Sequence, residues 1–259
     1  MTPGALIILF FVSIYLIHKI SCFKNYIEQF QNFHSDVNNN PLSNQTIKIN
    51  DLKYGNYDQM TSDFVKNHSI QSFPLPLPLN EMNQPPENLS QQTIKELDFL
   101  LNLSQNANDQ QKKSADNYEK NIFDEFITYC HTNKLFYERS YLEQIQNDIK
   151  SFCLQLKSLY NRPRPYQLGF YIRKNILPRP IVHSMTPSYP SYSTLLSKTL
   201  ANVLSYNNPN HSENLHIIAK EVELSRLIGG YNYPSDNQAS LQIAAIIKKY
   251  IKYLEIPKK

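Results

Sequence analysis

The stretch Lys157-Ser-Leu-Tyr-Asn-Arg-Pro-Arg164-Pro165 joins a helical pattern to a segment that its prolines prevent from being helical. We expect Lys157 near the end of the helix and Arg164 just beyond it. An arginine presents a planar fork of N–H groups, and a lysine presents a compact charge. Together they suit the oxygens of one phosphate. The stretch therefore suggests a phosphate clamp, although Lys, Arg and Pro at fixed offsets also arise by chance.

A second stretch, Ser188-Tyr-Pro-Ser191-Tyr-Ser-Thr194, leads directly into an apolar helical pattern. Backbone N–H groups at the start of a helix lie at the positive end of its dipole and form a natural anion site. A plain N-cap at Ser191 accounts for the same residues. Both interpretations stay open for this stretch alone.

A third stretch, Ser225-Arg226-Leu-Ile-Gly-Gly-Tyr-Asn232-Tyr-Pro-Ser-Asp236, places an arginine at a predicted helix end and an acid at the next helix start. The paired glycines between them favour a tight turn. Taken alone, this is also the pattern of an ordinary corner between two helices, with Asp236 as an N-cap.

Helical periodicity runs through the rest of the C-terminal two thirds of the chain. Apolar residues recur at intervals of three and four, and no segment keeps a period of two. We predict an all-α fold. The expected helices cover residues 90–103, 118–132, 141–160, 193–205, 211–227 and 237–254.

Composition excludes several classes of protein. The 259 residues carry a net charge of +4 without a Lys/Arg block, which argues against a nucleic-acid partner. Only 5 glycines are present, so a Gly-rich nucleotide loop is not expected. Cys22, Cys130 and Cys153 lack metal-ligand spacing and are interpreted as free thiols, with a Cys130–Cys153 disulfide as the alternative in an exported protein.

The N-terminal run from Ala5 to Ile20 is apolar enough for a short membrane helix. Its n-region has no Lys or Arg and no small-x-small cleavage site follows, so residues 1–22 are predicted as a membrane anchor, with a cleaved signal as the alternative. Lysines at positions 19 and 24 follow the apolar run, and the positive-inside rule then places the rest of the anchored chain in the cytosol. Cleavage of the segment would instead give a secreted protein.

Residues 23–72 are polar and Asn-rich, and we predict a linker there. Alternating prolines in Phe73–Leu79 force an extended path, and the folded domain is predicted to start at that segment and to cover residues 73–259.

In order and spacing, the three stretches resemble the signature of the type 2 phosphatidic acid phosphatase and vanadium haloperoxidase superfamily. That signature reads Lys-x6-Arg-Pro, Pro-Ser-Gly-His and Ser-Arg-x5-His-x3-Asp. The likeness covers Phe73 to Pro257 and is greatest to the class A non-specific acid phosphatases, which also have a Pro-rich run and a Ser-Tyr-Pro-Ser stretch. The resemblance implies a helical bundle of the acid phosphatase and haloperoxidase type.

The resemblance also implies roles for individual residues. The positions that match the phosphate-binding residues are Lys157, Arg164, Ser191 and Arg226. Asp236 matches the aspartate that orients the nucleophilic histidine.

Three positions depart from the signature. Asn232 replaces the histidine that attacks phosphorus, Ser193 replaces the histidine that protonates the leaving group, and Tyr192 replaces a glycine in the phosphate pocket. An amide cannot form a phosphohistidine-like intermediate, and a serine is far too weak an acid near pH 7. His183 lies in the same loop but at no family position, so it is a poor replacement.

These departures favour a membrane-tethered, catalytically inactive phosphatase-like protein that keeps a phosphate cradle. An active phosphomonoesterase or lipid phosphatase with a rearranged site is one alternative, and a scaffold whose pocket Tyr192 fills is another. No metal and no cofactor are expected. The expected partners are phosphate or a phosphorylated small molecule or lipid, the membrane through Ala5–Ile20, and a second copy of the chain in a homodimer.

Overall fold

The computed structural model describes residues 48–55, 59–118, 121–178 and 186–251. From Ile49 onward these residues belong to one compact unit. The predicted anchor Ala5–Ile20 lies outside the described residues, as do Cys22 and His183. None of the described helices has the length and apolar character needed to cross a bilayer.

The described residues form helices joined by turns, without a strand, as the periodicity predicts. The α-helices are α3 (Gln59–Asn67), α4 (Gln91–Asn106), α5 (Asp109–Tyr118), α6 (Ile122–Thr132), α7 (Arg139–Tyr160), α8 (Pro165–Tyr171), α9 (Tyr192–Asn207), α10 (Ser212–Ile228) and α11 (Pro234–Lys248). Single 3-10 turns cover Leu79–Glu81 and Pro209–His211.

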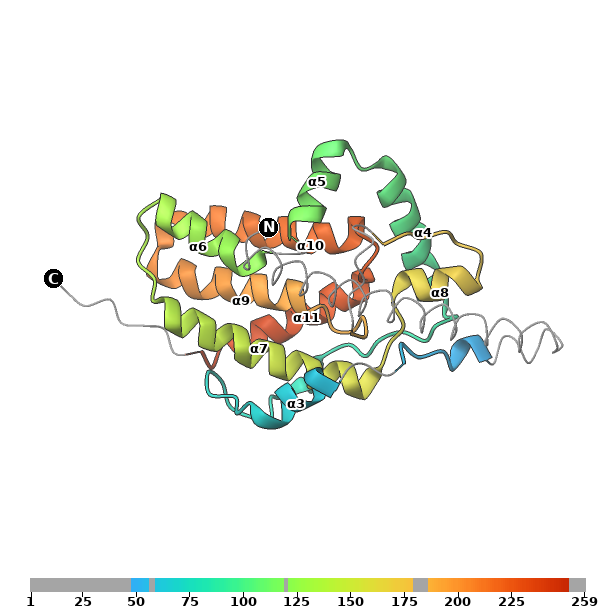
Figure 1. The fold of residues 1–259 in the computed structure, drawn as a ribbon, viewed down its shortest axis with the longest axis horizontal. Coiled ribbons are helices and arrows are strands. Elements are labelled where there is room, and N and C mark those ends of the chain that lie inside the picture. Colours follow the sequence, from blue (N-terminus) through green and yellow to red (C-terminus); the bar gives the residue numbers. More distant parts are fainter. Residues whose placement is uncertain (1–47, 56–58, 119–120, 179–185, 252–259) are drawn as a thin grey trace, which may run out of the picture. The chain divides into compact units, whose positions relative to one another are not determined.

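Helix α9 lies at the centre of the bundle, in contact with α6, α7, α10 and α11 (Figure 1). Most of its side chains are buried, including Leu195, Leu200 and Val203. A helix that is buried on nearly all sides is surrounded by other helices. Its polar residues stay compatible with burial because their hydroxyls bond to the helix itself, as Thr199 Oγ1 does to Leu195 O at 2.8 Å.

The end of α7 is fixed by a left-handed residue, Asn161, at φ 46° and ψ 39°. An asparagine tolerates this conformation better than most residues, and it ends the helix one residue past Tyr160. The chain then runs extended to Arg164, the N-cap of α8, whose first residue is Pro165. Lys157 therefore lies on the last turn of α7 and Arg164 beyond it, which confirms the local prediction.

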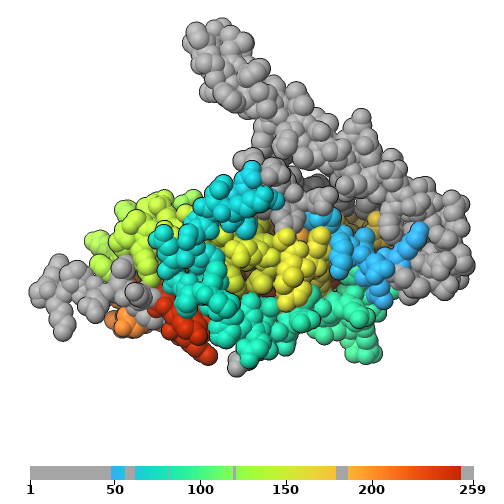
Figure 2. Space-filling model, turned by 90° about the horizontal axis from the view of Figure 1, so that it is seen from below, coloured from blue at the N-terminus to red at the C-terminus, as the bar shows by residue number. Residues whose placement is uncertain are grey.

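The compact unit begins at Ile49, whereas the sequence pattern predicts a domain start at Phe73. Helix α3 lies against α7, across its outer surface in Figure 2. Asp148 of α7 is fully buried and accepts hydrogen bonds from His68 Nε2 at 2.6 Å and Ser72 N at 2.7 Å. This attachment uses polar groups instead of an apolar stripe, so hydrophobic patterning does not reveal it.

Cys130 of α6 and Cys153 of α7 are buried free thiols, so the alternative of a disulfide between them is wrong for this structure. Burial raises the pKa of each thiol to about 11, which keeps both protonated at neutral pH.

Candidate functional site

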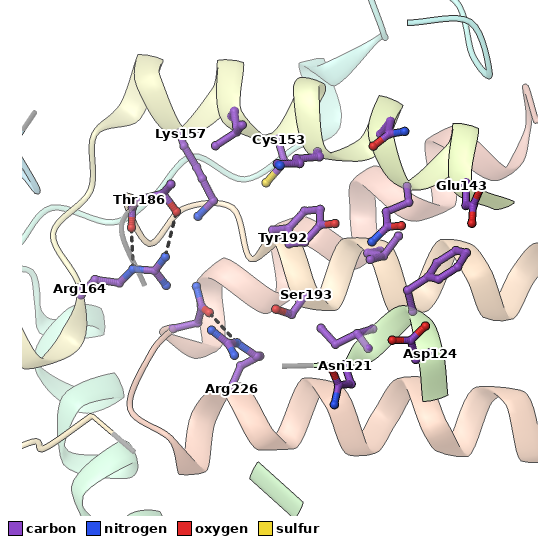
Figure 3. A pocket seen from close by; sticks show the side chains of 18 of the residues that line it. Asn121, Asp124, Glu143, Cys153, Lys157, Arg164, Thr186, Tyr192, Ser193 and Arg226 are labelled. Carbon is purple, nitrogen blue, oxygen red and sulfur yellow. Dashed lines mark hydrogen bonds between the residues drawn. The ribbon is translucent and has the colours of Figure 1, made fainter. Parts of the chain in front are cut away.

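A cavity of about 600 Å³ lies between α6, α7, α9 and the turns that flank α8 and α10 (Figure 3). Lys157, Arg164 and Arg226 line one end of it, together with Thr186 and Asn232. The three cationic side chains come from two of the three sequence stretches, and each residue is at most 4% exposed. The structure thus brings together three of the four predicted phosphate-binding residues.

Lys157 projects from the last turn of α7 toward the loop that precedes α9. Its ammonium donates to the carbonyl oxygen of Pro187 and, at 3.3 Å, to that of Ser188. Burial and the positive charge of Arg164 lower the pKa of Lys157 to about 7. This lysine is held by neutral dipoles in a place where positive charge already accumulates.

Arg164 is held by the same loop and by the corner after α10. Its Nε donates to Thr186 O at 2.8 Å and its Nη1 donates to Tyr231 O at 2.7 Å. Figure 3 shows the guanidinium bonded to Thr186 at the basic end of the cavity. Burial lowers the pKa of Arg164, and the charge of Arg226 acts in the same direction.

Asn232 links three parts of the site. Its amide nitrogen donates to Ser188 O at 2.7 Å and to Asp236 Oδ2 at 3.3 Å. Its amide oxygen accepts from Arg226 Nε at 3.4 Å, and Arg226 also lines the cavity. Asn232 is 1% exposed. It is therefore a structural link between the loop, α10 and α11.

Asp236 is fully buried and does not line the cavity. Its Oδ1 pairs with Arg162 Nη1 at 2.6 Å, and its Oδ2 accepts from Tyr233 N at 2.8 Å. The second oxygen also reaches the amide of Asn232, so Asp236 contacts the position that the resemblance assigns to its partner.

Arg162 belongs to this network and was not among the predicted site residues. Its guanidinium lies over the ring of Tyr233, 3.8 Å from Cζ to the centroid, and its Nη2 lies 3.4 Å from Glu96 Oε2. Glu96 in turn accepts from Ser235 N at 2.8 Å. Burial opposes the charge on Arg162, but Asp236, Tyr233 and Glu96 together outweigh it, and the pKa of Arg162 is raised.

A signal for Arg162 was present in the alternation Arg-Pro-Arg-Pro. Residues two apart in an ideal strand share a face, but the short extended segment between α7 and α8 does not keep this alternation. Arg162 and Arg164 consequently point into different surroundings, one into the network with Asp236 and the other into the cavity.

Ser191 is fully buried and caps α9, with its hydroxyl 2.9 Å from Thr194 Oγ1. It does not line the cavity, so the structure does not bring this predicted phosphate ligand to the three cations. Tyr192 and Ser193, which follow it, do line the cavity. In Figure 3 the ring of Tyr192 lies between the cations and the outer residues Asp124 and Glu143, and both groups line the same cavity.

The residues at this site fit a tetrahedral oxyanion by charge, and vanadate has the same shape as phosphate. They do not fit a metal–nitrogen bond at position 232, because an amide nitrogen that donates two hydrogen bonds has no lone pair to give. Among the described residues, no group of three or more His, Cys, Asp or Glu side chains is arranged to hold a metal ion.

No family model matches the chain, and no curated protein sequence does. Among solved structures, a bacterial vanadium-dependent iodoperoxidase is similar, with a TM-score of 0.50 and 13% sequence identity over 68% of this chain. The chain spans about half of that protein, 53% of its length. The likeness establishes an all-α fold resembling that of the vanadium haloperoxidases.

Proposed function

We propose that this protein binds a phosphate-like oxyanion without turning it over, as a pseudophosphatase tethered to a membrane by Ala5–Ile20. The observation that carries the proposal is the convergence of Lys157, Arg164 and Arg226 on one buried end of a cavity. Buried cations of like charge disfavour one another, and a bound anion reverses this effect. The pKa of Lys157, lowered to about 7, is consistent with such a site.

The chemistry of two further positions supports binding over turnover. Asn232 stands where the resemblance implies the nucleophile, and its amide is engaged by Ser188 O, Asp236 and Arg226. Ser193 lines the cavity where the resemblance implies the general acid, and a hydroxyl cannot donate a proton efficiently near pH 7. Losing a general acid alone costs about 10²–10⁴ in rate.

The persistence of the cavity beside Tyr192 favours an anion receptor over a scaffold that binds nothing. Tyr192 shares the wall with Ser193 and Leu196 of α9, while the three cations still line the same space. We therefore expect the tyrosine to narrow the cavity while leaving the space between the three cations open for the oxyanion.

The decisive experiment is titration of the full-length protein with orthovanadate and inorganic phosphate by calorimetry, next to a phosphomonoester turnover assay. We expect binding that is competitive between the two anions, and no turnover above background. The control is Lys66→Met, at the last turn of α3 and outside the cavity. Absence of binding to either anion would favour the scaffold, and turnover that survives Asn232→Ala would mean a different nucleophile.

Reversion tests whether the cradle is intact. The variant carrying Asn232→His, Ser193→His and Tyr192→Gly should gain measurable hydrolysis, because the cations are in place to hold the phosphoryl group. Adding Asp236→Ala should lower the recovered rate. A folded triple variant that neither binds vanadate nor hydrolyses a phosphomonoester would contradict the proposal.

The tether is tested separately. Fractionation of the full-length chain and of a variant lacking residues 1–22 should place only the former with membranes. Recovery of the full-length chain in the aqueous phase without detergent would overturn the anchor while leaving the oxyanion site untouched.

A further inference from the structure

We propose that a polar track along α7, in the outer part of the cavity, binds the hydrophilic organic group of a phosphate monoester and discriminates against acyl chains. This inference rests on the proposed oxyanion site, because the phosphate of the same ligand would occupy the basic end. It assigns a ligand class and a set of α7 side chains to the half of the cavity that the three cations do not use.

The first support is the size of the cavity. A water molecule occupies about 30 Å³ of liquid, so a tetrahedral oxyanion of five heavy atoms fills only a small share of about 600 Å³. Pockets of about 300–1,000 Å³ are typical of sites for whole small molecules. The remaining space extends from the cations toward Asn121, Asp124 and Glu143 (Figure 3).

The second support is the spacing of the α7 residues that line this space. Going from the outer to the inner end, they include Glu143, Gln146, Lys150, Cys153 and Lys157. Steps of three and four residues keep side chains on one face of a helix. At 1.5 Å of rise per residue, the face from Glu143 to Lys157 extends over about 20 Å. One face of α7 thus connects the basic end to the outer end.

The chemistry of the outer walls selects the ligand class. Glu143, Gln146 and Asn147 of α7 offer carboxylate and amide groups, and Asn121 and Asp124 offer more from the start of α6. An acyl chain would strip water from these groups without replacing their hydrogen bonds, which costs free energy at each one. Hydroxyl groups on a sugar or a nucleoside would satisfy them.

Apolar side chains complete the track. Phe123 of α6 and Leu196 of α9 line the same space, so the walls alternate apolar surface with hydrogen-bonding groups. A sugar ring has the matching pattern of C–H faces and hydroxyl edges. Gln146 is half-buried and lies between Glu143 and Lys150 on the face of α7 that lines the cavity. This makes Gln146 the central specificity residue of the track.

The experiment compares three ligands by calorimetry on the full-length protein: inorganic phosphate, glucose 6-phosphate and dioctanoyl phosphatidic acid below its micellar concentration. We expect glucose 6-phosphate to bind about tenfold more tightly than phosphate, and the lipid to bind no better than phosphate. Gln146→Leu should abolish the advantage of the sugar phosphate and leave phosphate binding within about twofold. Gln155→Leu is the matched control, since Gln155 is an exposed residue of α7 outside the cavity.

Each other result has a distinct meaning. Equal affinity for phosphate and glucose 6-phosphate would overturn the track while leaving the oxyanion site in place. Tighter binding of the lipid would overturn the ligand class. Failure of all three ligands to bind would reject the oxyanion site and with it this inference. Should Gln146→Leu unfold, as judged by circular dichroism, Asn147→Leu tests the same wall from a more exposed position.

Discussion

Arg162 and Arg164 stand two residues apart, and their surroundings are of opposite kinds. Arg162 faces the carboxylates of Asp236 and Glu96, and the charge of Asp236 raises its pKa. Arg164 faces the carbonyls of Thr186 and Tyr231 inside the cavity, and burial lowers its pKa. A buried cation matched by carboxylates stabilises the fold. A buried cation held by neutral dipoles, close to other cations, is suited to an incoming anion.

The largest expected effect is a loss of stability at Arg162, the arginine that pairs with carboxylates. Arg162→Met leaves the buried carboxylates of Asp236 and Glu96 without their cation, and removal of one member of such a network costs about 3–5 kcal/mol. Urea unfolding followed by circular dichroism measures the loss. The control is Arg173→Met, an exposed position where a change within about 0.5 kcal/mol is expected. A loss below about 1 kcal/mol would show that the network is not a structural element.

The next largest effect is expected at Lys157 in the cavity, and it is a loss of affinity for the anion. Lys157→Met should weaken orthovanadate binding roughly 10- to 100-fold, because a charged hydrogen bond contributes about 1.5–3 kcal/mol. Stability should not fall, since the folded state no longer has to bury an ammonium group. Lys150→Met is the control on the same helix, at an exposed position two turns before Lys157, with a change of less than about threefold expected. Equal losses in both variants would contradict a localised basic end.

A pH titration sharpens the same contrast. Lys157 has a pKa of about 7 in the folded protein against an ordinary value of 10.5, so the unfolded chain binds its proton more tightly. Stability should therefore rise as pH increases from 7 toward 10.5, by on the order of 2 kcal/mol between pH 7 and 9. The slope should disappear in Lys157→Met and shrink in saturating phosphate, which stabilises the charged lysine. A slope that persists in Lys157→Met belongs to another group.

The smallest effect is expected at Tyr192. Tyr192→Ala should change the affinity for inorganic phosphate by no more than about threefold, because the tyrosine lies on the wall beyond the cations (Figure 3). The measurement is the same calorimetric titration. A gain above about tenfold would mean that the ring occupies the place of the anion in the wild-type protein.

The helical architecture was largely predictable, because apolar spacing defines buried faces. The helix predicted over residues 141–160 matches α7 apart from its first two residues, because α7 starts at Arg139. The helix predicted over residues 193–205 lies within α9. Helix ends were less predictable: α11 begins at Pro234 instead of residue 237, since a proline fits the first turn of a helix. Helices α5 and α8 were missed because both are short, and α5 is mostly polar.

The cationic residues of the site were predictable from the sequence, whereas the residues that contact them were not. The family-like spacing indicated Lys157, Arg164 and Arg226, and the structure brings them to one cavity. Ser191 failed to reach it because its hydroxyl serves the N-terminus of α9, an outcome that the sequence already left open. Arg162 was missed because its role depends on Glu96, which is distant in sequence. Periodicity reports burial and does not report which charges meet.

Asn88 determines at which residue a shortened form of this protein can begin. Its amide nitrogen donates to the carbonyl oxygens of Ile49, Asn50 and Leu52, at 2.9, 3.1 and 2.9 Å. The segment that it holds reaches the end of α7, where Tyr54 N donates to Asn161 O at 2.9 Å. A fragment that starts at Phe73 would lack the contact between Tyr54 and Asn161. It would also expose the buried amide of Asn88. Expression of the folded part alone should therefore begin ahead of Ile49.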